Sequence, residues 1–240
     1  DWVVDTAITR IGYIKEISEK VDIDNDNIIT VLEMSDWVVD TAITRIGYIK
    51  EISEKVDIDN DNIITVLEMS DWVVDTAITR IGYIKEISKK VDIDNDNDNI
   101  ITVLEISDWV VDAAISRLHI IQEISKKVDI DIDNDNIITV LEISDWVVDA
   151  AIARLHIIQE INKKVNIDID NIIRVLKLSH GDGDLTMKRI EYIHKIKQKY
   201  KINNDDIIAR LIKSNWDYER AIMIIDLEEK NKKQKGTWRK

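Results

Sequence analysis

Four segments of this 240-residue chain carry aspartates at alternate positions and a glutamate further along. Carboxylate oxygens are the ligands that Ca²⁺ prefers, and a calcium loop of about 12 residues takes them mainly from positions 1, 3, 5 and 12. The four segments place acidic residues at these positions: Asp22, Asp24, Asp26, Glu33, Asp57, Asp59, Asp61, Glu68, Asp94, Asp96, Asp98, Glu105, Asp131, Asp133, Asp135 and Glu142. One hypothesis is therefore a calcium-binding protein with EF-hand-like loops.

The same segments also fit a second interpretation, in which they are solvated turns and helix caps. An alternating Asp/Asn tract can arise by slippage, so the four matches are not independent of one another. The next two copies of the segment have Lys177 and Ile212 where the glutamate belongs, yet they keep the apolar spacing. Because the fold does not need these ligands, our main interpretation assigns no metal and no cofactor.

The composition narrows the class of protein. Proline, cysteine and phenylalanine are absent and 45% of the residues are hydrophobic, as expected for a folded helical chain with few helix breakers. Without cysteine, disulfides, thiolate metal sites and cysteine nucleophiles are excluded. No phosphate-binding glycine loop and no Ser-His-Asp set is apparent, so we expect no enzyme. The abundance of Ile, Asn, Asp and Lys is typical of an AT-rich genome.

The net charge of −14 disfavours general binding to nucleic acid or to an anionic membrane. No stretch approaches 18 uninterrupted apolar residues, and the chain opens with Asp1-Trp2-Val3-Val4, unlike a signal peptide. We therefore expect an intracellular protein, most simply a cytoplasmic one.

An internal repeat organises the chain. Residues 1–35 and 36–70 are identical, and Gly181 occupies the tryptophan position of one later copy. We divide the chain into repeats 1–35, 36–70, 71–107, 108–144 and 145–179, a divergent repeat with a partial seventh at 180–229, and a basic, disordered tail at 230–240. The recurring tryptophans, which we take as a candidate binding surface, are Trp37, Trp72, Trp109, Trp146 and Trp216.

Each repeat contains one long and one short helical pattern. From Val4 to Val21 apolar residues recur at steps of three or four, which predicts an amphipathic helix of about 18 to 20 residues. A shorter apolar set, Ile28 to Met34, follows the acidic loop, with Asp26 or Asn27 placed to cap it. Ser35-Asp36 is then expected to cap the next long helix, whose first turn holds the tryptophan.

A pair of helices this small cannot bury its own apolar stripe, so neighbouring copies must stack. The sequence therefore predicts an all-α protein of about 13 helices, arranged as an α-solenoid-like tandem array with a period of 35 to 37 residues. At residues 180–184 the sequence His-Gly-Asp-Gly-Asp replaces the start of a long helix, and we expect a loop that interrupts the array.

A closed unit extends from the middle of one long helix to the middle of the next. The clearest example comprises residues 190–196, 205–211 and 215–222. This unit resembles the ubiquitin-associated (UBA) fold, and in particular the UBA-like domains of the nascent-polypeptide-associated complex alpha subunit, huntingtin-interacting protein K and elongation factor Ts. The matching pattern is Leu32 through Val38, Val39, Ala42 and Ile43, and it recurs around Ala7, Ala77, Ala114, Ala151 and Ala221.

The resemblance implies a non-catalytic, protein-binding scaffold whose partner is ubiquitin, a ubiquitin-like protein or a nascent-chain or ribosome-associated protein. Two ubiquitin-binding features of the family are absent: the Met-Gly-Phe/Tyr turn, replaced by Val21-Asp22-Ile23-Asp24, and the di-leucine that ends helix three. A third hypothesis is a recently expanded structural repeat that has no specific ligand.

Charge is distributed unevenly along the chain. Residues 180–240 hold 15 basic and 10 acidic residues, whereas residues 1–179 hold 18 basic and 37 acidic ones. The basic tail at 230–240 is the one segment suited to contact RNA or an acidic protein. Head-to-tail self-association, in which this tail meets the acidic repeats of a second copy, is a further expectation.

Overall fold

The computed structural model describes residues 2–91, 97–128, 132–165 and 167–237, and it has only helices as regular elements there. The chain forms two compact units, Asp1–His119 and Ile120–Lys240. Thirteen helices lie in the described residues, and long and short helices alternate, which confirms the predicted all-α tandem array. Asp94, Asp96, Asp131 and the end of the tail at 238–240 lie outside the described residues.

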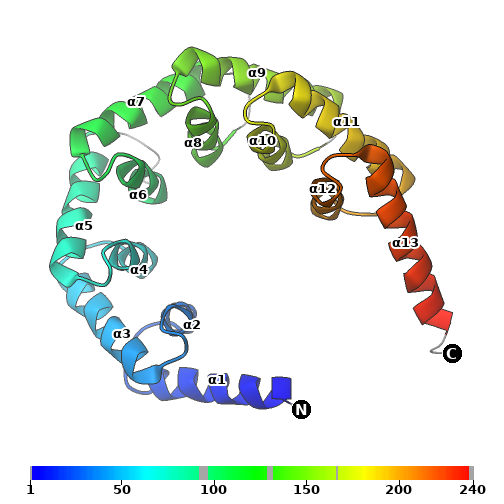
Figure 1. Cartoon of the computed structure of the whole chain (residues 1–240). Helices are drawn as coiled ribbons and strands as arrows, with labels where there is room; N and C mark the ends of the chain where they lie inside the picture. The colour runs from blue at the N-terminus through cyan, green and yellow to red at the C-terminus, as the bar shows by residue number, and fades with distance from the viewer. Residues whose placement is uncertain (1, 92–96, 129–131, 166, 238–240) are drawn as a thin grey trace. The chain divides into compact units, whose positions relative to one another are not determined.

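The long helices form one row within each unit, and the short helices lie along one side of that row (Figure 1). The long helices are α1 (Trp2–Ser18), α3 (Val39–Ser53), α5 (Val74–Ser88), α7 (Val111–Lys127), α9 (Val148–Lys164), α11 (Gly183–Lys199) and α13 (Tyr218–Thr237). The short helices are α2 (Asn25–Met34), α4 (Asn60–Met69), α6 (Asn97–Ile106), α8 (Asn134–Ile143), α10 (Ile169–Leu178) and α12 (Asn204–Lys213).

The core lies where short and long helices pack together: α2, α4, α10 and α12 each contact the long helices on both sides, α6 contacts α5, and α8 contacts α9. In α4, Ile63, Val66 and Leu67 are fully buried, and Ala77 at the start of α5 is equally buried. The small alanine side chain allows the two helix backbones to approach closely. Burying one Ile or Leu side chain stabilises by about 1.5 to 3 kcal/mol, so the packing between copies supplies what one copy lacks.

The short helix begins earlier than the sequence pattern suggested. Its N-cap is Asp24, whose carboxylate accepts a hydrogen bond from the backbone N–H of Asn27 at 2.8 Å, and α2 starts at Asn25. The expectation that Asp26 or Asn27 caps α2 is therefore wrong. Asn27 lies instead in the first turn, where its buried side-chain amide donates to the same Asp24 carboxylate.

The turn after the short helix also differs from the prediction. Ser35 ends α2 as its C-cap, and the N–H of Trp37 reaches back to the carbonyl of Leu32 at 2.8 Å while that of Asp36 bonds to Glu33. These two bonds form a Schellman motif, which closes the last turn of a helix. Asp36 and Trp37 both have positive φ, 50° and 61°.

As a result, the tryptophans of the internal copies precede the long helix, and α3 starts only at Val39, with Val38 as an N-cap that makes no side-chain bond. The long helices from α3 to α11 have 15 to 17 residues, shorter than expected, because the turn uses the residues around the tryptophan.

Two predictions for the C-terminal part are wrong. Residues 180–184 do not interrupt the array: His180 and Gly181 repeat the positive φ values of the turn, and α11 begins at Gly183 with Asp182 as its N-cap. The segment 230–237 is helical rather than disordered, because α13 continues to Thr237. Its Lys, Glu and Gln residues are good helix formers, and Gly236 is the first helix-breaking residue after Tyr218.

Candidate protein-binding surface

Four of the internal tryptophans lie in the turn beside an arginine of a preceding long helix. The guanidinium carbon of Arg45 is 4.4 Å from the centre of the Trp72 ring, and the same contact joins Arg10 to Trp37, Arg80 to Trp109 and Arg189 to Trp216 at 4.3 to 4.4 Å. Such cation–π contacts contribute about 0.5 to 1 kcal/mol at exposed sites. All five predicted tryptophans are half-buried.

The same arginine also donates hydrogen bonds to the turn that ends the preceding short helix. Arg80 donates to the carbonyl of Met69 and to the hydroxyl of Ser70, the C-cap of α4, at 3.0 Å. Arg45, Arg117 and Arg189 make the equivalent pair of bonds. Because Arg189 is partly buried, its pKa is lowered. We call this arrangement the Ser–Arg–Trp contact: the C-cap serine of one copy, the arginine ten residues later, and the tryptophan of the next turn.

Gly181 shows what the turn requires of its second residue. Its φ is +75°, a conformation that glycine adopts without strain and that tryptophan adopts at a cost. Arg154 donates from Nε to the Gly181 carbonyl at 3.2 Å and still bonds to Ser144. A Cβ at position 181 would lie 2.7 Å from Arg154 Nε, so this arginine occupies space that a side chain would need.

The predicted tryptophans are thus part of a joint between consecutive copies. Their rings keep some exposure, so the binding surface stays a prediction, while four of them are observed to pack against an arginine. Sequence reasoning missed the arginine, although its constant distance of ten residues from the serine was visible in the repeat.

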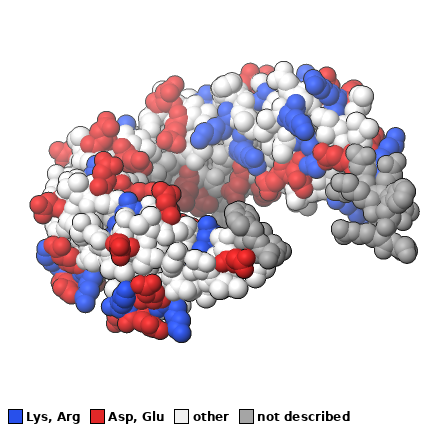
Figure 2. Space-filling model, turned by 60° about the horizontal axis from the view of Figure 1, so that its bottom comes forward, with Lys and Arg blue, Asp and Glu red and all other residues white. Residues whose placement is uncertain are grey.

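The outward faces of the first unit's short helices repeat one acidic pattern. The sequences of α2, α4 and α6 hold no Lys or Arg, and their exposed acidic side chains are Asp26, Glu33, Asp61, Glu68, Asp98 and Glu105. Asp26, Glu33, Asp61 and Glu68 take part in no ion pair with another described residue. Residues 1–119 hold 26 acidic and 11 basic residues in total. Figure 2 shows groups of acidic side chains, with basic ones between them, on the visible surface of the chain.

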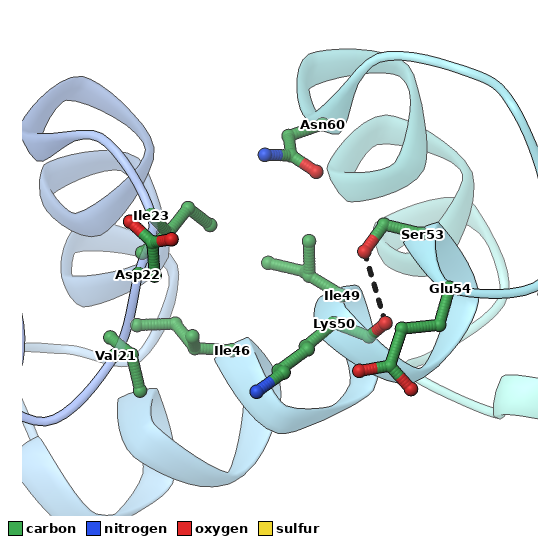
Figure 3. A pocket seen from close by; sticks show the side chains of 9 residues that line it. All are labelled: Val21, Asp22, Ile23, Ile46, Ile49, Lys50, Ser53, Glu54 and Asn60. Carbon is green, nitrogen blue, oxygen red and sulfur yellow. Dashed lines mark hydrogen bonds between the residues drawn. The ribbon is translucent and has the colours of Figure 1, made fainter.

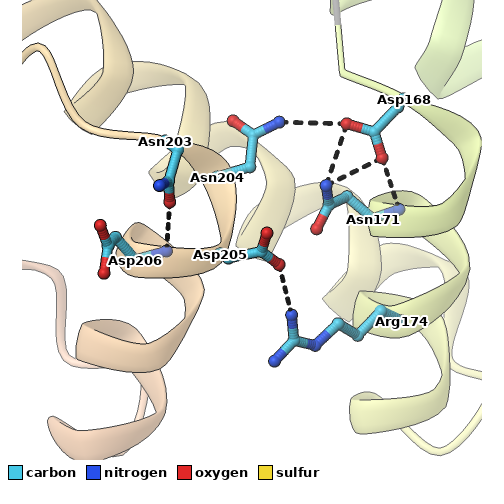
Figure 4. Close-up of polar contacts among 7 residues, drawn as sticks. All are labelled: Asp168, Asn171, Arg174, Asn203, Asn204, Asp205 and Asp206. Atoms are coloured by element: carbon cyan, nitrogen blue, oxygen red, sulfur yellow. Dashed lines mark hydrogen bonds and ion pairs between the residues drawn. The ribbon is translucent and has the colours of Figure 1, made fainter. Parts of the chain in front are cut away.

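In the second unit α8 keeps this acidic pattern with Asp135 and Glu142, whereas α10 and α12 hold basic residues. Arg174 on α10 pairs with Asp205 on α12 at 2.7 Å, and the Asp168 carboxylate accepts hydrogen bonds from Asn171 on its own helix and from Asn204 on α12 (Figure 4). Burial raises the pKa of Asp168, but the hydrogen bonds from Asn171 and Asn204 outweigh it and hold that pKa below its ordinary value. Polar bonds therefore connect neighbouring short helices here.

The candidate calcium ligands do not surround a common point in the first copy. Asp24 is used as a helix cap, and the backbone N–H of Asn27 holds its pKa below the ordinary value. Asp26 and Glu33 both belong to α2, seven residues apart, which corresponds to about 10 Å along the helix axis. The second copy repeats this with Asp59 as the cap.

Among the described residues, no three His, Cys, Asp or Glu side chains are grouped so that they could hold a metal ion. Asp133 caps α8 in the same way as Asp24 caps α2, while Asp94, Asp96 and Asp131 lie outside the described residues. The geometry is that of capped helices, and it lends no support to the calcium hypothesis.

A pocket of about 220 Å³ opens between the loop after α1, α3 and the start of α4 (Figure 3). Val21, Ile23, Ile46 and Ile49 supply its apolar walls. Polar side chains, including Asp22, Lys50, Glu54 and Asn60, complete the lining. Such a pocket can receive one apolar side chain of a partner protein. Its lining residues come from two copies of the repeat, so the sequence of a single copy does not indicate the pocket.

Comparison with family models, with curated proteins and with solved structures finds no match to this chain. The resemblance to UBA-like domains therefore stays a prediction. Of the described helices, none combines the length and the apolar character that crossing a bilayer would require.

Proposed function

We propose that this protein is a non-catalytic protein-binding scaffold, and that the short-helix faces of its first unit bind a basic segment of a partner protein. The observation that carries the proposal is the repeated acidic face: α2, α4 and α6 each expose one aspartate in the first turn and one glutamate near the end, and hold no basic residue. Like charges held in register attract an oppositely charged partner and select its spacing.

The arrangement of the helices makes these faces act together. The helices α2, α4 and α6 are neighbours on one side of the row of long helices. At physiological salt concentrations electrostatic attraction stays effective over about 8 to 10 Å, so a basic segment must lie directly on these faces to be attracted. The pocket at Ile46 and Ile49 adds a place where an apolar side chain of the bound segment can be buried.

The UBA-like resemblance supports the same class of function. The helices α11, α12 and α13 form a three-helix group in which α12 packs against both long helices. Of the partners that the resemblance implies, a basic ribosome-associated protein matches the acidic faces better than ubiquitin does, because the family's ubiquitin-binding turn is missing here.

A binding assay with charged probes tests the proposal. A fluorescein-labelled poly-Lys peptide should bind the protein at low salt, and the variant Glu33→Gln/Glu68→Gln/Glu105→Gln should weaken binding about tenfold or more, since each lost contact contributes to a shared site. A matched control, Glu16→Gln/Glu51→Gln/Glu86→Gln, removes three acidic charges from the long helices instead. Purified ubiquitin serves as the second probe.

Equal weakening by both triple variants would show that only net charge matters, and it would contradict a site on the short helices. Absence of binding to poly-Lys at low salt would favour a structural repeat without a specific ligand. Tight ubiquitin binding that the short-helix variant leaves unchanged would place the binding surface elsewhere.

A further inference from the structure

The first-unit pocket between α2 and α4 has a matching place between α10 and α12 in the second unit, and the two places differ. The pocket of about 220 Å³ is lined by residues between Val21 and Asn60, from the loop after α1, from α3 and from the start of α4 (Figure 3). Ile46 and Ile49 in its lining are 2% and 1% exposed, whereas Val21 and Ile23 are only half-buried. Aliphatic surface of the pocket therefore stays open to solvent.

The matching place in the second unit is closed. Ile167, which occupies the position of Ile23, is only 3% exposed. Asn204, which occupies the position of Asn60, is buried and donates a hydrogen bond to the Asp168 carboxylate at 3.3 Å (Figure 4). This bond ties the start of α12 to the N-cap of α10. The repeat can therefore bury its loop isoleucine, and the open pocket belongs to the first unit's version of this contact.

The polar edge of the pocket differs in the same way. In the second unit the Gln198 and His194 side chains form a hydrogen bond with each other at 2.7 Å. The first unit has Glu54 and Lys50 at these two positions, and both side chains line the pocket. Where the second unit uses its polar groups on one another, the first unit therefore presents charged groups to the pocket.

Three polar side chains of the pocket have no hydrogen bond or ion pair with any other residue that the structure describes: Asp22, Glu54 and Asn60. In Figure 3, Asp22 and Glu54 lie on opposite sides of Ile49. Two carboxylates and one ammonium group, that of Lys50, leave the edge with a net negative charge. Charge complementarity therefore favours a basic group at the edge, while the isoleucines favour an aliphatic group inside.

We propose that this pocket selects the partner: it binds one leucine or isoleucine side chain of the basic segment, and a lysine or arginine beside that residue contacts Asp22 and Glu54. The inference rests on the function proposed above and adds the residue that the bound segment must carry. Burying a leucine side chain is worth more free energy than one solvent-exposed ion pair. The aliphatic residue therefore distinguishes the partner from other basic segments.

Two peptides of equal charge provide the probe. Both are fluorescein-labelled and contain four lysines on each side of a central residue, which is leucine in one peptide and serine in the other. Each peptide is titrated with the full chain at low salt while fluorescence anisotropy is recorded. We expect the leucine peptide to bind about tenfold or more tightly than the serine peptide, because only leucine can bury an aliphatic side chain in the pocket.

Two variants change the pocket in opposite ways. Ser53→Trp introduces a large ring at an exposed position of the edge, and Ile23→Ser removes a half-buried aliphatic side chain. Each should reduce the preference for leucine to about twofold or less and leave the affinity for the serine peptide unchanged. The matched control Val38→Ser removes an exposed valine outside the pocket and should keep the preference. Circular dichroism checks that each variant keeps the wild-type helix content.

A third variant tests the charged edge. Asp22→Asn/Glu54→Gln should weaken both peptides alike, about threefold or more, because both keep their lysines. The control Glu51→Gln/Glu86→Gln removes two carboxylates that pair with lysines of their own helices, and it should have a smaller effect.

The outcomes separate this inference from the proposed function. Equal affinity of the two peptides for the wild type would overturn the inference and leave the proposed function intact, whereas binding of the leucine peptide alone would contradict the acidic-face function and keep the pocket. A leucine preference that survives both Ser53→Trp and Ile23→Ser would place the leucine elsewhere. A wild-type dimer in analytical ultracentrifugation that Ser53→Trp converts to a monomer would assign the pocket to a second copy of this chain.

Discussion

The helices α4 in the first unit and α10 in the second show which features of the repeat can change. Leu67 and Leu176 occupy the same position and are both fully buried, and the C-cap serines Ser70 and Ser179 have similar backbone angles. Their exposed faces differ in part: both expose an aspartate in the first turn, Asp61 and Asp170, but α10 also exposes Arg174, and Lys177 stands where α4 has Glu68. The buried positions and the turn are kept while the outer face varies, because solvated side chains contribute little to stability.

The same contrast holds for the units as wholes. Residues 1–119 hold 26 acidic and 11 basic residues, whereas residues 120–240 hold 21 and 22. Only in the second unit does an arginine on one short helix pair with an aspartate on the next, within the part of the chain that the structure describes. The units therefore share a framework and differ in what they can attract, which can be tested by changing each feature in both units.

The largest expected effect comes from the Ser–Arg–Trp contact, which both units share. Arg80→Leu and Arg189→Leu each remove charged hydrogen bonds to a C-cap serine and the adjacent carbonyl, while Leu keeps a similar helix propensity. Each variant should lose about 1 to 3 kcal/mol in the free energy of unfolding. Urea unfolding followed by circular dichroism measures this loss.

Arg174→Leu provides the control for that experiment, because it breaks an exposed ion pair and should cost about 1 kcal/mol or less. If Arg80→Leu or Arg189→Leu is no more harmful than this control, the shared contact is not what holds the turns. A loss confined to one unit would show that the two frameworks are not equivalent.

A smaller effect is expected at the second residue of the turn, which is Trp72 in one copy of the first unit and Gly181 in one copy of the second. Trp72→Ala keeps a positive φ that suits only glycine and removes the ring over Arg45, whereas Trp72→Gly removes the strain as well. We expect Trp72→Ala to be less stable than Trp72→Gly by about 1 kcal/mol. In the second unit, Gly181→Ala should also destabilise, since its Cβ meets Arg154.

Thermal unfolding of the three variants decides the matter. An alanine variant at position 72 that equals or exceeds the glycine variant in melting temperature would show that the turn imposes no strain, and that the tryptophan is retained for another reason.

The smallest effect concerns acid. The pKa values of Asp24 in the first unit and Asp168 in the second lie below their value in the unfolded chain, so the unfolded state binds more protons near pH 3.8. Their contribution to stability is therefore present above about pH 4 and is lost as the pH falls through the lowered pKa. The urea midpoints at pH 6 and pH 3 should therefore differ more in wild type than in a variant that lacks these carboxylates.

Asp24→Asn and Asp168→Asn are the direct test, because asparagine can still accept the capping hydrogen bond but does not titrate. Both variants should lose less stability than wild type between pH 6 and pH 3. An unchanged pH dependence in both would show that the caps do not contribute to acid sensitivity.

The sequence predicted the alternation of long and short helices and the buried positions because both follow from apolar periodicity, which is a local property. It did not predict the helix boundaries. Asp24, Asp26 and Asn27 are all reasonable caps by residue type, and the choice of Asp24 depends on its backbone lying in the extended region. The helical state of residues 230–237 was missed because their charge suggested a tail.

The candidate surface was predictable only in part. The tryptophans, the acidic residues and the recurring arginine were visible in the repetition, but the contacts of the arginine with the serine and the tryptophan were not, since the three residues belong to different helices and turns. The calcium hypothesis stays a prediction; the structure adds that Asp26 and Glu33 lie about 10 Å apart along one helix, which their spacing in the sequence did not indicate.

Residues 4–18 and 39–53 mark the limit of what sequence determines in this protein. Their identical sequences fix the same helix and the same apolar stripe, because local propensity and side-chain period depend on the residues alone. Only the tertiary structure decides that Ile46 is buried and Ile11 is exposed, since burial depends on whether a short helix packs against that stripe. The helix and its apolar stripe are properties of the repeat sequence, whereas burial is a property of the helices that pack beside it.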